Sequence, residues 1–595
     1  MGRTLASVLA ILFSFLFSFS ADAYVATVSQ NGNQVRWRDP VKIPLAGNPS
    51  NQSGITDTAF FSAVVRGLQR WQSASAGKAN FDYWQGSDTS VYAPNSDYNG
   101  LSSIYFASSA GGAGISNNVL GLTQVWYNTD TGEILEADIV LNDLSYHFST
   151  NVRDTSGYGS QSSGYGRNVY IENVITHELG HAFGLSHSAG MQSTMLFMES
   201  PEQAYLGCDD QIAIRFLYPG DDNGVRGALR GSVVSETNGA SIFGAHVLAI
   251  SRKRGTVLAT AITDSSGNYS INALEPGSYF LIAEPFFAGA SALPSYYSSI
   301  NSRVCGTKSF SRTLLTDGDP NRPHSINVSA GDVTSAPPIQ AKCDPSGGAA
   351  IIQSTSNNPV SAPIVFDGTS QPSGGFGFAD KFGSSGTIYH RLRSVAGRIE
   401  VHAMGYSLYS PIHPSVYLID SDGRSVDTER NEYVYNGNSG YVNYDSSLVA
   451  SDLPSGDYYI KISASSLSAS VYPAGPTALD QVPFLLITGS VNENGSPALA
   501  ASLAVNARCK MAEDFPAYSS PPGGPQRKSV SNNDEEEDDD GWGFCSFLTT
   551  RDTNSKNNQG PSAGAAVGWF LPWLFILVVL RSARRVEIYK KLQLS

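Results

Sequence analysis

Apolar side chains in the first third of the chain recur with helical periods in some segments and form short strand-like runs in others. The clearest helical stripe lies within residues 56–74, where apolar residues are spaced by three and four: Ala59, Phe60, Ala63, Val64, Leu68 and Trp71. Two further helices are predicted over residues 168–183 and 209–218. Apolar runs bounded by Gly, Asn and Asp predict strands at three places: 104–107, 120–127 and 137–141. Residues 24–220 are therefore expected to form one domain of mixed helices and strands.

The helical pattern disappears after residue 220. Residues 226–345 begin with short alternating strands and have turn sequences at 264–267 and 275–277, which predicts an all-β sandwich. Residues 350–508 are again strand-rich and predict a second β-sandwich. The chain is thus expected to be multidomain, with one mixed domain followed by all-β domains.

The N-terminal residues 1–23 have the pattern of a secretory signal peptide. Arg3 supplies a positive start, residues 5–19 are almost wholly apolar, and the Ala-Asp-Ala sequence at 21–23 fits a small-residue cleavage site. A transmembrane anchor is the alternative, but the short apolar core and the small-residue exit argue against it. Export is therefore expected, with a mature chain that begins near Tyr24.

The C-terminal part of the chain has three segments of different composition. Residues 513–562 are rich in Pro, Gly, Ser, Asn and acidic residues, so they are expected to form a flexible tether, with the acidic run 534–540 as a solvated spacer. Residues 563–580 are apolar and long enough to cross a bilayer, and the basic residues of 581–595 follow them. A buried core helix is the alternative for 563–580, but no folded domain remains to bury it. We therefore expect a transmembrane helix with a cytoplasmic tail, which anchors the exported protein in the cell envelope unless this end is processed.

Charge and cysteine content narrow the choice of partners and cross-links. The formal net charge of the 595 residues is −14, and no basic patch with interleaved aromatic residues is present, so no nucleic-acid partner is expected. The chain has five cysteines, which in an exported protein can form disulfides, and Cys305 and Cys343 are the favoured pair. The odd count leaves at least one thiol free or processed. Cys545 is either a processing or lipidation point or an incidental residue.

One short segment carries a metal-binding pattern. His177 and His181 are four residues apart on a predicted helix, so their imidazoles project from the same face, one turn apart. Two nitrogens at this spacing can bind one Zn²⁺ at about 2.0–2.1 Å each. Glu178 follows the first histidine and is therefore expected beside the metal, where it can act as general base on a zinc-activated water.

Gly184 and His187 complete the pattern. Glycine tolerates the backbone conformation that ends a helix and turns the chain sharply, so this turn can return His187 to the metal as a third ligand. Three protein nitrogens leave the fourth position open for water and substrate, as in a catalytic zinc site. With ordinary residue frequencies, the complete pattern arises by chance in roughly a few chains of this length per hundred thousand. Histidines that make only ordinary hydrogen bonds are a much weaker interpretation.

Residues 177–187 resemble the signature of metzincin zinc proteases. Ser188 directly after the third histidine, and Met195 eight residues beyond it, resemble the matrixin branch of that family. Two flanking segments are also similar to matrixins: residues 209–219 and 137–142. The resemblance implies an α+β zincin fold, a Met-turn that places Met195 under the zinc, and a hydrogen bond from Asp210 to that turn. It also implies that Asp209 pairs with a mature amino terminus.

The chain departs from the matrixin pattern in three ways. No pro-segment with a zinc-blocking cysteine separates the signal from the first domain. Only His147 lies outside the signature in this domain, so a second, structural zinc is not expected. The residues after Met195 lack the proline expected after a Met-turn, which leaves the wall of the specificity pocket undefined. One catalytic Zn²⁺ is the expected cofactor, and a structural Ca²⁺ is left open.

Other resemblances concern the segments after the first domain. Residues 226–285 resemble carboxypeptidase regulatory-like domains through motifs that begin at Gly231, Gly244, Thr263 and Leu274. Within residues 350–508, the motifs at 416–423 and 453–462 resemble the pre-peptidase C-terminal sandwich of secreted bacterial proteases, and the end of the chain resembles bacterial sorting tails. Such modules are expected to hold or localise a protein rather than to catalyse a reaction.

Together these features predict an exported, envelope-associated zinc metalloendopeptidase that acts on protein or peptide substrates. In this interpretation Glu178 takes a proton from the zinc-activated water and passes it to the leaving nitrogen. One alternative is a surface adhesin or matrix-binding protein that uses the metzincin domain as a scaffold, and another is a structural surface-layer protein. The intact Glu178 favours the enzyme, because a scaffold has no need of a general base.

Overall fold

The computed structural model describes, with short gaps, residues 26–285, 310–341, 364–466, 484–490 and 544–549. Larger gaps within the first of these ranges are 86–97 and 152–167. The predicted signal peptide, the predicted membrane span and the favoured disulfide pair lie outside the described residues. Among the described residues, no helix combines the length and the apolar character needed to cross a bilayer.

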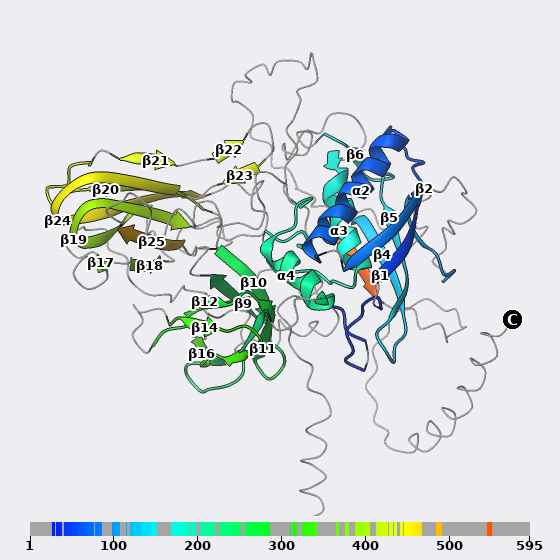
Figure 1. Ribbon diagram of the computed structural model, residues 1–595, viewed down its shortest axis with the longest axis horizontal. Helices are drawn as coiled ribbons and strands as arrows, with labels where there is room; N and C mark the ends of the chain where they lie inside the picture. Colours follow the sequence, from blue (N-terminus) through cyan, green and yellow to red (C-terminus); the bar gives the residue numbers. More distant parts are fainter. Residues whose placement is uncertain are drawn as a thin grey trace, which may run out of the picture. The chain divides into compact units, whose positions relative to one another are not determined.

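The first domain is built on a twisted mixed sheet (Figure 1). Its strands follow the order β2-β1-β3-β5-β4. They are β1 (Val41–Gly47), β2 (Ala79–Gln85), β3 (Ser102–Phe106), β4 (Val119–Tyr127) and β5 (Ile134–Leu141). All neighbouring pairs are parallel except β4 with β5, which is antiparallel. One further strand, β26 (Phe544–Thr549), pairs in parallel with the other edge of β4, within the range expected to be a tether.

The described residues of this domain form three helices beside the sheet: α2 (Asp57–Ala74), α3 (Ile171–Ala182) and α4 (Cys208–Leu217). The predicted helix 168–183 begins three residues later than expected, because Asn168–Tyr170 forms β7, which pairs in parallel with β6 (His147–Ser149). Helix α3 packs against α2 on one side and against β4 and β5 on another. All of its side chains are buried, so it runs through the core of the domain.

The packing of α2 on α3 explains why the helical stripe was the clearest sequence signal. A Cβ added to Gly67 would lie 2.9 Å from Leu179 Cδ1, so the glycine permits close approach of the two helices. Trp71 is fully buried, and its indole N–H donates a 2.8 Å hydrogen bond to the Thr176 carbonyl. Apolar burial and this hydrogen bond therefore help to hold α3 at a defined depth in the domain.

The described part of residues 226–345 is all-β. One sheet has the order β10-β9-β12-β13, with β14 also on β12, and the other has the order β11-β8-β15, with β16 also on β8. The strands are β8 (Gly227–Ser235), β9 (Ala245–Ser251), β10 (Thr256–Ile262), β11 (Asn268–Leu274), β12 (Gly277–Pro285), β13 (Thr313–Leu314), β14 (Ile326–Val328), β15 (Val333–Ser335) and β16 (Ile339–Ala341). The turn expected at 264–267 is present: Asp264 accepts hydrogen bonds from the N–H groups of Ser266 and Asn268.

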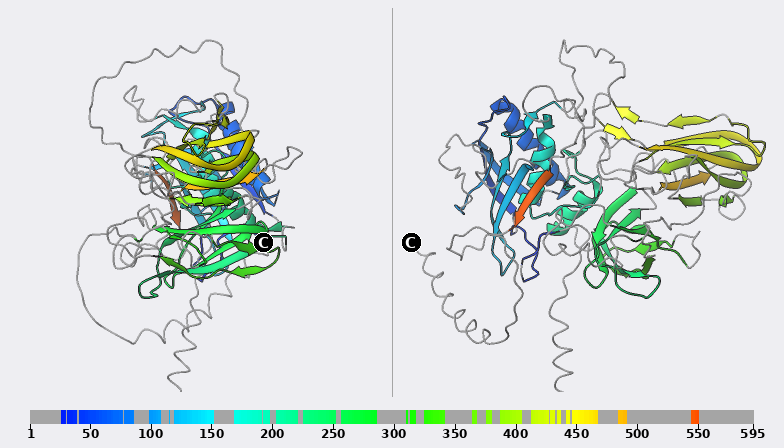
Figure 2. Two further views of the ribbon diagram at one scale, coloured as in Figure 1. Left: turned by 90° about the vertical axis from the view of Figure 1, so that its left-hand side faces the viewer. Right: turned by 180° about the vertical axis from the view of Figure 1, so that it is seen from behind.

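The described part of residues 350–508 is also all-β, and its main sheet has seven strands. Long strands β19 (Thr387–Met404) and β24 (Ser446–Ser466) run antiparallel at its centre (Figure 2). The other members are β17 (Ile364–Asp367), β18 (Gly375–Ala379), β20 (Ile412–Ile419), β21 (Glu429–Asn431) and β25 (Phe484–Ser490). A separate hairpin joins β22 (Val434–Asn436) and β23 (Tyr441–Asn443). The chain is therefore multidomain with a high β content.

A buried ion-pair cluster fixes the start of α3 against α2. Glu172 is 2% exposed, and its carboxylate contacts the guanidinium groups of Arg66 and Arg70, the latter at 3.0 Å. Burial raises the pKa of Glu172, but the two arginines outweigh this effect and hold the pKa below its ordinary value of 4.5.

We expect Glu172→Gln to lower the free energy of unfolding of the first domain at pH 7 by about 2 kcal/mol, because Arg70 loses a buried charged partner while the partly exposed Arg66 is screened by solvent. Urea denaturation followed by tryptophan fluorescence measures this change. Since the folded-state pKa lies below the unfolded value, the difference between wild type and variant should shrink as the pH falls below about 4.5. Glu133→Gln is the control, because Glu133 pairs with an exposed Arg38, and its effect should stay below about 1 kcal/mol. Equal effects of the two substitutions would contradict the interpretation.

Candidate metal centre

Helix α3 carries two of the three candidate metal ligands. His177 and His181 lie one turn apart on it and are both fully buried. The centroids of their rings are 4.7 Å apart. Because apolar neighbours such as Val174 and Leu179 anchor the helix in the core, the two imidazoles have little freedom to move.

The chain turns sharply after α3 at Gly184. The N–H of Leu185 donates to the carbonyl of Gly180, and the N–H of Gly184 donates to the carbonyl of His181, which together form a Schellman motif. Gly184 has a φ of +100°, and a Cβ at this position would lie 2.0 Å from the carbonyl oxygen of Val35. Only glycine satisfies both the backbone angle and this close approach.

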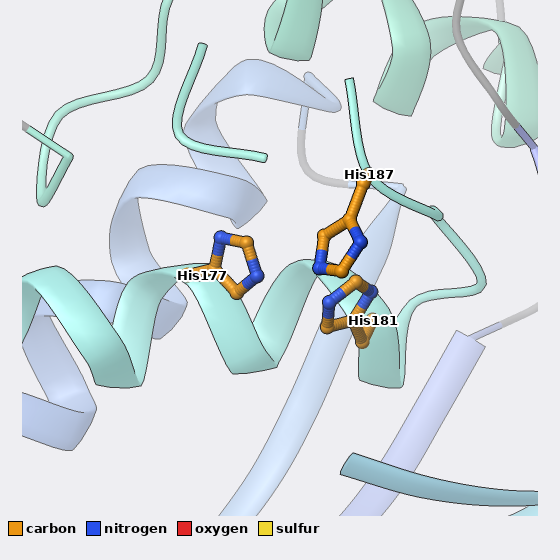
Figure 3. Close-up of side chains that lie close together, drawn as sticks. All are labelled: His177, His181 and His187. Carbon is orange, nitrogen blue, oxygen red and sulfur yellow. The ribbon is translucent and has the colours of Figure 1, made fainter. Parts of the chain in front are cut away.

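The turn returns His187 to the two helical histidines, as Figure 3 shows. Its ring centroid lies 5.4 Å from that of His177 and 4.9 Å from that of His181. One potential ligand atom from each residue lies within 4.8 Å of the others, and all three residues are buried. The structure therefore brings together the three histidines expected from the sequence.

Backbone carbonyls orient the two helical imidazoles. His177 Nδ1 lies 2.7 Å from the Thr194 carbonyl oxygen, and His181 Nδ1 lies 2.8 Å from that of Leu185. A carbonyl can only accept, so each Nδ1 must donate its proton, and each Nε2 carries the lone pair. His177 Nε2 is buried and makes no hydrogen bond among the described residues. This tautomer is the one that a metal ligand requires.

Electrostatics keep the imidazoles neutral. Burial, together with the neighbouring His187, lowers the pKa of His177 to about 3. Burial and the two other histidines hold the pKa of His181 well below its ordinary value of 6.5. Both groups are therefore deprotonated at neutral pH and need not release a proton to bind a cation.

The turn that carries Met195 packs against the helix that bears the two histidines. Met195 is 2% exposed, and a Cβ on Gly180 would lie 2.2 Å from its Sδ atom, so the methionine packs directly on the α3 backbone between the two ligands. Asp210 Oδ2 accepts hydrogen bonds from the N–H groups of Thr194, at 2.6 Å, and Gly207, at 2.7 Å, while its Oδ1 accepts from the Met195 N–H at 3.1 Å. Asp210 thus binds the backbone of the turn that carries Met195.

Asp209 has two partners that the sequence did not suggest. Its carboxylate accepts hydrogen bonds from the Ser188 hydroxyl and from the Thr260 backbone N–H on β10, the latter at 2.8 Å. Burial raises the pKa of Asp209 to about 7. The amino terminus that was expected to pair with Asp209 lies outside the described residues. Cys208, next to it, is disulfide-bonded.

Glu178 faces the sheet from its position between the two helical ligands. Its side chain is fully buried, and its Oε2 atom accepts a 2.6 Å hydrogen bond from the hydroxyl of Thr123 on β4. No local pattern links these residues, because 55 positions separate them in the chain.

Gln203 is a second site residue that the sequence did not reveal. Its side-chain N–H₂ donates to the carbonyl of Thr194 at 2.9 Å and to that of Leu196 at 2.7 Å. It thereby holds the same carbonyl that orients His177. A glutamine in an irregular segment carries no spacing signal, so only the folded structure identifies it.

The donor set suits one zinc ion. Three buried imidazoles are a common catalytic zinc site, and no carboxylate of the described residues joins the three histidines in their cluster. The buried Nε2 of His177 also requires a partner that the described residues do not supply. The residues present therefore fit a zinc ion.

Comparison with known families gives two matches. A matrixin family model matches residues 127–219, and a carboxypeptidase regulatory-like domain model matches residues 228–289. These matches support a metzincin-like zinc metalloprotease with a β domain. The matrixin match covers a short region, so the finer resemblances of the other segments remain predictions.

Whole-chain comparisons add no further support. No curated protein shows a significant match. Among solved structures, the chain matches the major pilin subunit BcpA of Bacillus cereus, with 10% identity and a TM-score of 0.11. The match covers 41% of this chain and 59% of that one, and at this TM-score it carries no conclusion about the fold.

We expect Gly184→Ala to weaken zinc binding by roughly 10- to 100-fold, because the turn can no longer deliver His187 in register. Competition titration with a chromophoric chelator measures the affinity. Gly32→Ala is the matched control, since Gly32 also has a positive φ, of +78°, but open space around it. Wild-type zinc affinity in the Gly184 variant would show that the turn does not set the site.

Proposed function

We propose that the chain is an exported, envelope-associated zinc endopeptidase of the matrixin type. The observation that carries this proposal is the convergence of three buried histidines, with Glu178 between two of them on the same helix. The matrixin match over residues 127–219 points to the same class. A purely structural zinc would have no use for an acid at this position.

Each residue has a defined task in this reaction. His177, His181 and His187 would hold the zinc, which when bound would supply a polarised water and a Lewis acid for the scissile carbonyl. Glu178 would accept a proton from the attacking water and pass it to the leaving nitrogen. Met195 packs under the ligands, and Asp210 holds the turn that carries Met195. The substrate is a protein or peptide.

The proposal also places the enzyme at the cell envelope. It rests on the signal-like residues 1–23, the apolar segment 563–580 and the basic end of the chain. In this proposal the β domains hold the protease at a distance from the membrane and take no part in bond cleavage.

We expect the full-length protein to cleave a denatured protein or a peptide library, and a chelator to abolish cleavage until zinc is restored. Glu178→Gln should lower kcat by at least about 100-fold while zinc content stays at one ion per chain, because the general base alone is lost. Mass spectrometry of the digests and metal analysis measure both quantities. Glu133→Gln is the control for loss of a carboxylate. Full cleavage by the Glu178 variant, or zinc binding without any cleavage by wild type, would contradict the enzyme and favour a binding protein.

We expect the full-length chain to fractionate with membranes and a chain that ends at residue 562 to be released into the medium, because the apolar segment supplies the anchor. Fractionation of expressing cells followed by immunoblotting measures the distribution. Equal release of both forms would contradict a membrane anchor.

A further inference from the structure

Strand β4 presents two residues to Glu178, Gly121 and Thr123. They are two positions apart on the strand, so they face the same side of the sheet, which is the side that packs on α3. Thr123 is fully buried, and its Oγ1 atom lies 2.6 Å from Glu178 Oε2 and 3.1 Å from the Glu178 carbonyl oxygen. The shorter distance lies in the normal range of an O–H···O hydrogen bond, so the Thr123 hydroxyl donates to the carboxylate.

Gly121 makes room for the same carboxylate. A Cβ at this position would lie 2.7 Å from Glu178 Oε1 and 2.7 Å from Val174 Cγ1. Any side chain at 121 would therefore displace either the glutamate or the helix. Because Gly121 lies against Oε1 and Thr123 binds Oε2, the strand defines the position of both carboxylate oxygens.

We propose that Thr123 is a positioning residue for Glu178, with Gly121 as the gap that admits the carboxylate. This inference rests on the proposed peptidase function. A glutamate side chain has three rotatable bonds, and a general base works only within hydrogen-bond reach of the proton it takes. One hydrogen bond from the sheet removes most of this freedom before the substrate arrives, so the orientation costs nothing during the reaction.

The alternative is that the hydroxyl only satisfies a buried carbonyl at the contact between β4 and α3. The two roles differ in what they change. Loss of a positioning contact lowers kcat and leaves KM and zinc content unchanged. Loss of a packing contact lowers stability, and it changes kcat, KM and zinc content together or changes none of them.

The test uses zinc-loaded, full-length protein with Thr123→Val, which keeps the shape and removes the hydroxyl. We expect kcat to fall by roughly 10- to 100-fold, the range that corresponds to loss of a hydrogen bond to a charged group, with KM changed less than about twofold. Zinc content should remain at the wild-type value. Thr123→Ser, which restores the donor, should return kcat to within about threefold of wild type. Gly121→Ala should lower kcat as Thr123→Val does, because it displaces the same carboxylate.

Thr263→Val is the matched control. Thr263 is also fully buried, and its hydroxyl donates a 2.6 Å hydrogen bond, but to the Ile242 carbonyl in the first β domain. This variant should keep wild-type kcat. A Thr123→Val enzyme as active as the Thr263 control, a parallel loss of zinc, or a serine variant without rescue would overturn the positioning role.

A structural readout separates this inference from the proposed function. Crystal structures of wild type and Thr123→Val should show the Glu178 carboxylate displaced in the variant, whether or not the protein cleaves peptides. An unmoved carboxylate would overturn the inference and leave the peptidase proposal intact. A wild-type protein without chelator-sensitive cleavage would refute the peptidase and leave the contact itself to be judged by the crystal structures.

Discussion

The need to bring three buried imidazole nitrogens to one point constrains the rest of the first domain. A buried histidine must satisfy its second nitrogen, and here the carbonyls of Thr194 and Leu185 accept the Nδ1 protons of the two helical ligands. Those carbonyls belong to the segments that follow α3. The helix, the turn at Gly184 and the Met195 turn must therefore fold together for any one of the ligands to be oriented.

This dependence explains why polar contacts cluster beneath the site. Asp210 binds the backbone of the Met195 turn, and Gln203 binds the carbonyl that orients His177. Both side chains are buried, and each loses hydration that only a complete set of hydrogen bonds can replace. A buried polar network of this kind is costly when incomplete, and so it favours one arrangement of the turn over all others.

The mixed sheet of the first domain and the first β domain each hydrogen-bond a carboxylate near the histidines. Strand β4 contacts the candidate base through Thr123, and Asp209 accepts a hydrogen bond from Thr260 on β10. The second of these contacts was not expected from the sequence, which suggested only an amino-terminal partner for Asp209. The first β domain therefore contacts the first domain directly: Thr260 donates a hydrogen bond to the Asp209 carboxylate, which also binds Ser188.

Local sequence determined the features that depend on spacing alone. The four-residue interval places His177 and His181 on one helical face, and the apolar stripe that includes Trp71 identifies α2, because helix geometry repeats along the chain. Gly184 indicated a sharp turn, because glycine tolerates the backbone conformation that ends a helix. Tertiary structure alone decided that α3 begins at Ile171, that Thr123 binds Glu178 and that Gln203 binds the Thr194 carbonyl. These contacts join residues that are distant in the chain or lie in irregular segments, and no periodic pattern records which distant backbone or side chain will fill the space beside a buried polar atom.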